Sequence, residues 1–109
     1  MKNYIVSTID GLPIENTFNI QKENEVAALT AALSGLSKGL REDLDLGEIG
    51  TIIISGDKGC YGMRYIDNER ILGMMASDVT SENELLADID NLTFAMQNNE
   101  ISINSLAKV

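Results

Sequence analysis

The chain has 109 residues and a mass of 11.9 kDa, with 44% hydrophobic and 23% charged residues, which is typical of one soluble globular domain. Seventeen Asp and Glu residues against eight Lys and Arg residues give a net charge of -9, which argues against nucleic acid as a partner, because phosphate binding relies on cationic side chains. No apolar run approaches the roughly 18 residues of a membrane span and no signal-peptide core follows the N-terminus, so we expect a cytoplasmic protein without membrane insertion.

The acidity is strongest towards the C-terminus, because no Lys or Arg occurs between Ile71 and Ala107. Its ordinary interpretation is solubility, since net charge acts on solubility before it selects partners. A patch for a basic partner is the alternative.

The first predicted feature is a β-hairpin. Tyr4 to Ile9 is rich in β-branched and aromatic residues, which indicates a strand. Asp10-Gly11 is a strong turn signal, because Gly adopts a positive φ without a Cβ clash and Asp tolerates one. The chain then returns from Leu12 to Phe18, with Pro13 near the strand start or on a sheet edge because it has no N–H to donate. A catalytic role for Asp10 is the alternative to the turn.

The clearest predicted element is a long helix over residues 22–44. One apolar stripe follows the helical period and contains Val26, Leu29, Leu33, Leu36 and Leu40. A second stripe of small residues lies about 100° round the helix and contains Ala28, Ala32, Gly35 and Gly39. The polar side is marked by Thr30, Ser37 and Arg41.

The small-residue stripe is interpreted as a contact surface. Gly35 and Gly39 each cost about 1 kcal/mol of helix stability relative to alanine, so their presence calls for a packing reason. Small residues let another backbone approach closely, which predicts a helix–helix contact across a dimer axis. The alternative is that the glycines only loosen a helix that stops before Gly47.

Three further strands are predicted to form a meander. Thr51 to Ser55 is apolar on both faces, a pattern typical of a strand that is buried on both sides or central in a sheet. The turn Gly56-Asp57-Lys58-Gly59 leads to a fourth strand from Cys60 to Ile66. Asp67-Asn68 forms the next turn, and Glu69 to Ala76 is the fifth strand.

A second amphipathic helix closes the predicted order. Ser81-x-x-Glu84 has the spacing of a capping box, in which both side chains satisfy backbone N–H groups at the helix start. The apolar stripe that follows contains Leu85, Ile89, Leu92 and Met96. Phe94 points off this stripe and indicates another neighbour, and the helix ends near Asn98-Asn99. Residues 100–109 form a tail that either adds a short strand or stays mobile.

The residues offer little for catalysis. The chain has no histidine and a single cysteine, so an intrachain disulfide, a zinc cluster and the Ser-His-Asp and Cys-His arrangements are excluded. Cys60 is interpreted as a small strand residue rather than a nucleophile, since no histidine can serve as its base. A catalytic or metal-binding cluster is the weaker alternative to a solvated loop at Glu42, Asp43, Asp45 and Glu48. We therefore predict no catalytic residue, no metal and no cofactor.

Several segments together resemble the roadblock/dynein light chain family. They are the turn Asp10-Gly11-Leu12-Pro13-Ile14, the Ala/Leu-rich helix from Glu25 to Leu44, the apolar strand Thr51–Ser55, a Gly-bounded hairpin and the closing helix. The match covers roughly residues 4–98, so we expect a single roadblock-like domain over 1–109 with this core and a tail at 100–109. The predicted fold is α/β of the α+β type, in the order β-β-α-β-β-β-α. It has one five-stranded antiparallel sheet, with the long helix on one face and the C-terminal helix on the other.

The resemblance also implies a function. Members of the family typically dimerise by pairing the strand after the long helix, here Gly50–Ser55, and by packing the long helices together. The predicted dimer interface therefore comprises Ala28, Ala32, Gly35, Gly39, Thr51, Ile52, Ile53 and Ile54. Family roles are non-catalytic platforms for small Ras-like GTPases and dynein adaptors, so the expected partners are a second copy or a related roadblock chain, and a small Ras-like GTPase.

Two functional alternatives stay open at this stage. Sheets flanked by helices can hold a pocket between their layers, so one alternative is a small-ligand sensor domain. The other is an enzyme that uses carboxylates or Cys60.

The N-terminus departs from the family pattern. Members often begin with a helix before the first strand, whereas only Met1-Lys2-Asn3 precede Tyr4, so we expect part of one sheet face to be left to the closing helix, the tail or a partner.

Overall fold

The computed structural model describes residues 2–18, 21–48, 50–77 and 82–98. The strands are β1 (Lys2–Thr8), β2 (Pro13–Asn16), β3 (Ile52–Gly56), β4 (Gly59–Tyr65) and β5 (Arg70–Ala76), and the helices are α1 (Glu23–Asp43) and α2 (Glu82–Gln97). Their order along the chain and their types are those predicted. Ser81 of the predicted capping box and the tail at 100–109 lie outside the described residues.

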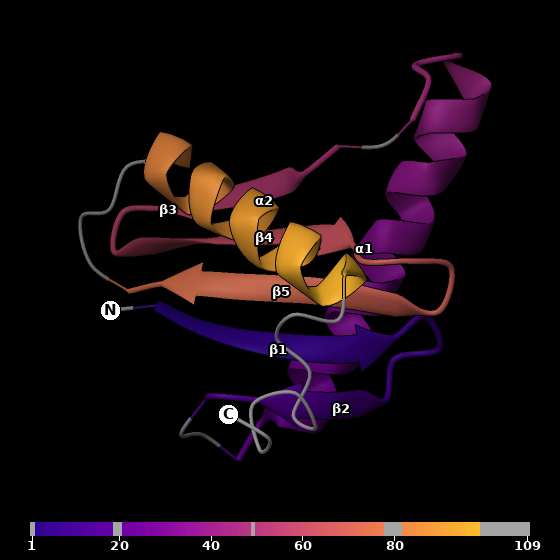
Figure 1. The fold of residues 1–109 in the computed structure, drawn as a ribbon. Helices are drawn as coiled ribbons and strands as arrows, with labels where there is room; N and C mark the ends of the chain where they lie inside the picture. The colour runs from indigo at the N-terminus through magenta and orange to yellow at the C-terminus, as the bar shows by residue number, and fades with distance from the viewer. Residues whose placement is uncertain (1, 19–20, 49, 78–81, 99–109) are drawn as a thin grey trace.

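All five strands form one antiparallel sheet in the order β2-β1-β5-β4-β3. The pairing of β1 with β5, in which Ile5 lies opposite Gly73, joins the N-terminal hairpin to the meander. The sheet lies between the two helices, with α2 on one face and α1 on the other (Figure 1). The predicted α+β fold, with one helix on each face, is confirmed.

The apolar core lies between α2 and the sheet. Side chains alternate between the two faces of a strand, so every second residue of β1, β4 and β5 points towards α2. The buried cluster consists of Val6, Cys60, Ile66, Leu72, Met74, Ala76, Leu85, Ile89 and Met96. The predicted apolar stripe of the second helix therefore packs on the sheet. Phe94, which lies off that stripe, is 62% exposed.

Small residues hold α1 against the other face. Ala27, Thr30 and Ser34 are buried there, and the Ser7 hydroxyl of β1 lies 3.4 Å from the Ala27 carbonyl oxygen, to which it donates. The prediction that Thr30 marks the polar side of the helix is therefore wrong. Its hydroxyl pairs with that of Tyr61, so a polar side chain is satisfied inside the protein and no longer needs water.

The Asp10-Gly11 pair forms the predicted turn. The Gly11 N–H donates to the Thr8 carbonyl oxygen over 3.0 Å, and the Leu12 N–H donates to the Thr8 hydroxyl over 3.0 Å. Gly11 has a φ of +93°, which an L-residue with a side chain rarely adopts, and it packs against the Cα of Ala28 in α1. Asp10 itself is exposed, so the pair acts on the fold by reversing the chain next to the helix.

The expectation that the Thr51–Ser55 strand is buried on both sides or central in the sheet is wrong within the described chain. β3 is the outermost strand on its side of the sheet and pairs with β4 alone among the described strands. Ile53 packs against the buried cluster on the α2 side, whereas Ile54 is 45% exposed on the other face. An apolar strand at an edge, without a covering element in the described chain, leaves hydrophobic side chains and backbone groups open to a partner.

Candidate functional site

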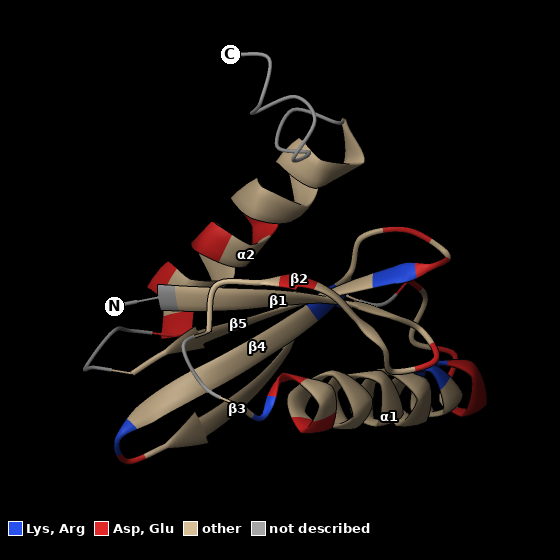
Figure 2. Cartoon of the chain, turned by 90° about the horizontal axis from the view of Figure 1, so that it is seen from below, with Lys and Arg blue, Asp and Glu red and all other residues tan. Residues whose placement is uncertain are grey.

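The outward side of α1 is apolar and exposed. Leu29, Leu36 and Leu40 are 64%, 68% and 59% exposed, and Leu33 is also exposed. We call these four residues the leucine face. No charged residue occurs between Glu25 and Lys38, and Figure 2 shows the charges of α1 gathered at its two ends. Because exposed apolar side chains cluster in this way mainly at contact sites, the leucine face is the first candidate for a functional surface.

The small-residue stripe lies beside the leucine face. Ala28, Ala32, Gly35 and Gly39 are all exposed. A Cβ added at Gly35 or Gly39 would meet nothing within 4 Å, so no contact within the described chain requires either glycine. The helix continues to Asp43, so these glycines lie inside the helix rather than at a loosened end. Ala28 differs from the others because Gly11 rests on it.

An apolar groove joins the leucine face to the sheet edge. Its volume is about 300 Å³, and it runs between α1 and the β3 side of the sheet. The lining residues are Phe18, Val26, Leu29, Thr30, Leu33, Ile54, Tyr61 and Met75. Leu29 and Leu33 of the leucine face and Ile54 of β3 thus belong to one continuous apolar surface.

The two edges of the sheet differ in how open they are. At the β3 edge, Thr51, Ile52 and Ile53 are partly buried and Ile54 is exposed. The opposite edge is β2, a strand of only four residues that begins with Pro13 and carries Glu15. Proline has no N–H to offer and a charge opposes stacking of another strand, so β2 is a protected edge and β3 an open one.

The predicted interface residues therefore fall into two groups. Of the predicted residues in and next to β3, Ile54 lines the apolar groove, whereas the small-residue stripe lies on the other side of the leucine face. The predicted interface leaves out the four leucines of the leucine face. The sequence does carry a signal for them. The leucine stripe and the small-residue stripe lie side by side, and no charged residue occurs from Val26 to Ser37. This uncharged surface is wider than the helix needs in order to pack on one sheet.

The residues considered for chemistry lie apart from this surface. Cys60 is 8% exposed and belongs to the buried cluster beneath α2. The four acidic residues after α1, at positions 42, 43, 45 and 48, are exposed. Among the described residues, no three His, Cys, Asp or Glu side chains gather as a metal site would require. In the same ranges, neither helix combines the length and the hydropathy of a membrane span.

A five-stranded antiparallel sheet between two helices, with an open apolar edge and an exposed helix face, defines a small α+β domain with a contact surface. The Roadblock/LC7 domain family model matches residues 2–78. The match covers more than half of the chain, so the chain belongs to the Roadblock/LC7 domain family, and the resemblance noted in the sequence is confirmed.

Solved structures with the same fold come from several bacteria. A Roadblock/LC7 domain from Streptomyces avermitilis superimposes with a TM-score of 0.79 at 15% identity, over 92% of this chain and 85% of that one. Myxococcus xanthus MglB gives 0.79 at 17% identity, over 88% and 80% of the two chains. The gliding protein MglB from Thermus thermophilus gives 0.77 at 9% identity, over 88% and 75%. No curated protein sequence matches this chain significantly.

Proposed function

We propose that the protein is a non-enzymatic homodimeric interaction module that binds or regulates a small Ras-like GTPase. One observation carries the dimer: the leucine face of α1 and the open edge of β3 are joined by an apolar groove. Two copies that pair their β3 edges continue the sheet from one protomer into the next. This pairing also brings the leucine faces of the two copies into contact and removes them from water.

The small-residue stripe adds to this arrangement. Gly35 and Gly39 leave the α1 backbone uncovered, so a second helix can approach it more closely than side chains of ordinary size would permit. Ala28, Ala32, Gly35 and Gly39 therefore stay in the proposed interface with Thr51 to Ile54, and the leucine face joins them. A related roadblock chain with the same apolar surface is the alternative second protomer.

The GTPase part of the proposal rests on the family. Roadblock proteins include platforms for small Ras-like GTPases, and the similar structures include MglB proteins. One of these was solved as "MglB with tetrameric arrangement", which supports self-association as a property of the fold. A pair of protomers related by two-fold symmetry offers the GTPase a broad surface that a single chain lacks.

Sedimentation of matched variants tests the dimer. The wild-type protein should sediment at about twice the mass of the chain, and Leu36→Gln should shift it towards the monomer by placing an amide in the apolar contact. Leu86→Gln is the control, because Leu86 is also exposed but lies on α2, across the sheet. Gly35→Leu should weaken association too, by forcing the helices apart. A wild-type protein that stays monomeric at micromolar concentration refutes the dimer.

Two measurements test the GTPase part. GTP hydrolysis by small Ras-like GTPases from the same source should change when the protein is added, if it regulates them. A scaffold binds without changing hydrolysis, so affinity capture with and without GTP analogues is measured in parallel. Failure of both, with the dimer intact, leaves a dimerisation module without the proposed GTPase partner.

The apolar groove supports a second candidate, a small-ligand sensor. Its volume of about 300 Å³ is at the lower end of the range for small-molecule sites, and its walls are mostly apolar. A metabolite that binds there should raise the melting temperature in a saturable way. Ile54→Gln and Leu33→Gln should remove that effect, whereas dimerisation without any ligand-dependent stabilisation favours the first candidate.

A further inference from the structure

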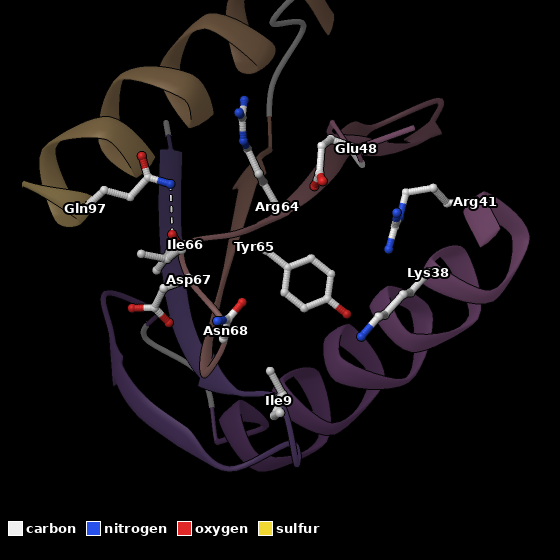
Figure 3. A pocket seen from close by; sticks show the side chains of 10 residues that line it. All are labelled: Ile9, Lys38, Arg41, Glu48, Arg64, Tyr65, Ile66, Asp67, Asn68 and Gln97. Carbon is white, nitrogen blue, oxygen red and sulfur yellow. Dashed lines mark hydrogen bonds between the residues drawn. The ribbon is translucent and has the colours of Figure 1, made fainter. Parts of the chain in front are cut away.

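A second cavity, of about 460 Å³, lies at the C-terminal end of α1 and is distinct from the apolar groove. We call it the α1-end pocket. Its lining residues are Ile9, Lys38, Arg41, Glu48, Arg64, Tyr65, Ile66, Asp67, Asn68 and Gln97. They come from the end of α1 and the segment after it, from the β4–β5 hairpin, and from the ends of β1 and α2 (Figure 3).

Cations gather in this pocket although the chain is strongly acidic. Three of the eight Lys and Arg residues line it, namely Lys38, Arg41 and Arg64. The periodicity of α1 explains the first two. Lys38 and Arg41 lie four and seven residues after Ser34, which puts them on the same side of the helix as the buried residues Ala27 and Ser34. The end of α1 extends past the strands in Figure 1, so at this point the sheet-facing side of the helix faces the pocket instead.

Some of the charged side chains that line the pocket already form ion pairs with other described residues. Arg64 is paired with Asp90 of α2, and Asp67 is paired with Arg70 at 2.9 Å. Within the described ranges, no hydrogen bond or ion pair holds the Lys38 ammonium group. The charged residues that line the pocket are three cations against Glu48 and Asp67, so their charges sum to one positive unit. Lys38 and Arg41 are the two of these cations that no carboxylate approaches more closely than 4.0 Å within the described residues.

The turn after α1 positions the guanidinium of Arg41. Asp45 and Gly47 have φ values of +54° and +85°, so the chain reverses direction directly after the helix. This reversal brings the Gly47 carbonyl oxygen to 3.1 Å from Arg41 Nη1, which donates to it. Glu42 lies further away, 4.0 Å from Nη2. The hydrogen bond to Gly47 thus directs the Arg41 guanidinium towards the pocket and leaves its other N–H donors for a ligand.

The opposite side of the pocket combines an aromatic ring with neutral polar groups. In Figure 3 the Tyr65 hydroxyl and the Lys38 amine point towards the same space, and the Asn68 amide lies beside the Tyr65 ring. Ile9, which is 46% exposed, adds an apolar side chain. A flat apolar group can pack on Tyr65 and Ile9 while an attached anion reaches the cations.

We propose that the α1-end pocket binds a small organic anion, a flat apolar group that carries one phosphate or carboxylate. Lys38 and Arg41 donate hydrogen bonds to the anionic oxygens, and Tyr65 and Ile9 contact the apolar group. Glu48 and the overall charge of -9 repel molecules with many negative charges, so a single anionic group is favoured over a polyphosphate or nucleic acid.

This site does not depend on the proposed dimer. None of its lining residues belongs to the leucine face or to β3, and it opens on a different side of α1. Anion binding is therefore expected in the monomer and in the dimer, and its failure leaves the proposed function unaffected.

Binding of simple probes to the full-length protein tests the site. We expect phenyl phosphate and benzoate to bind with dissociation constants on the order of 1 mM, as followed by calorimetry and by backbone amide NMR shifts around residues 38–41 and 65–68. Whichever of the two binds more tightly distinguishes a phosphate from a carboxylate ligand. Phenol, which lacks the anion, and inorganic phosphate, which lacks the ring, should both bind more weakly.

Matched charge variants assign the effect to the pocket. Lys38→Gln should weaken phenyl phosphate binding about tenfold, since a charge-assisted hydrogen bond is lost. Lys58→Gln removes the same charge from the β3–β4 turn and should leave binding unchanged. Circular dichroism checks that each variant folds. The proposal is overturned if neither probe binds at about 10 mM, if phenol binds as tightly as phenyl phosphate, or if both lysine variants weaken binding equally.

Discussion

The Tyr61 hydroxyl of β4 lies 2.6 Å from the Thr30 hydroxyl of α1, and either group can donate the hydrogen bond. This contact joins the helix to the sheet at the wall of the apolar groove, where Thr30 is buried and Tyr61 is partly buried. Gly73 of β5 makes it possible, because a Cβ at that position would overlap the Tyr61 hydroxyl. A glycine in the middle of a central strand, usually unfavourable, is thus explained by the close approach of a tyrosine.

Gly73→Ala should therefore lower the free energy of unfolding. The added methyl group displaces the Tyr61 ring and breaks its bond to Thr30, at a cost of about 1–3 kcal/mol that is typical of overpacking. Chemical denaturation measures the change. Gly50→Ala is the control, because a Cβ there meets nothing within 4 Å and should leave stability nearly unchanged. Equal effects of the two substitutions contradict the proposed role of Gly73.

Stability should also fall at high pH through Tyr61. Burial raises the pKa of Tyr61 above 10.0, and the hydrogen bond to Thr30 lowers it only in part. The folded chain thus holds the phenolic proton more tightly than the unfolded chain does. This contribution is fully present below pH 10 and is lost as the pH rises through the raised pKa.

Tyr61→Phe isolates that contribution. The variant should show a flatter decline of stability above pH 10, and at neutral pH it should lose about 1 kcal/mol with the hydrogen bond. Some decline remains, because burial and then the Glu15 charge raise the pKa of Tyr4 as well. Denaturation curves between neutral and strongly alkaline pH provide the measurement, and identical slopes for the variant and the wild type exclude Tyr61 as the source.

The Asp10-Gly11 turn provides a third prediction. Gly11 and Gly47 both have positive φ, but only at Gly11 would a Cβ come close to another element, at 3.1 Å from the Ala28 Cα. Gly47→Ala should cost about 1 kcal/mol for the backbone conformation alone. Gly11→Ala should cost more, since the turn must also move away from α1. A smaller loss for Gly11→Ala than for Gly47→Ala, in thermal or chemical unfolding, contradicts this account.

Adjacent residues of β3 should respond differently to the same substitution. Ile53 packs on the buried cluster, so Ile53→Lys should destabilise the fold by about 2 kcal/mol or more. Ile54 is exposed on the other face, so Ile54→Lys should leave the chain folded and weaken its self-association. Unfolding and sedimentation are measured on both variants. Loss of association without loss of stability in Ile53→Lys would reverse the assigned faces.

The order of the elements could be predicted from sequence because their signals are local. The Asp10-Gly11 turn, the 3.6-residue period of α1 and the period of α2 each depend on neighbouring residues, and all appear in the structure. The position of β3 could not be predicted in this way. An apolar strand requires burial, but the pattern does not say whether its own sheet or another copy supplies it.

The surfaces were harder to predict than the elements. Sheet-facing positions of α1 carry small side chains such as Ala27 and Ser34, while the large leucines point outward. The size and hydropathy of the side chains alone would therefore assign the wrong side of α1 to the sheet. The α1-end pocket gave no local signal at all. Lys38 and Tyr65 are far apart in sequence, and only the crossing of α1 over the sheet places their side chains on one cavity.

The unequal edges of the sheet set a limit on growth. If two copies join through β3, both ends of the combined sheet consist of β2, where Pro13 and Glu15 oppose the addition of a further strand. Strand pairing between copies therefore ends at the dimer. The molecule can expose an apolar edge without forming fibres, because association through that edge consumes it and leaves no second edge of the same kind.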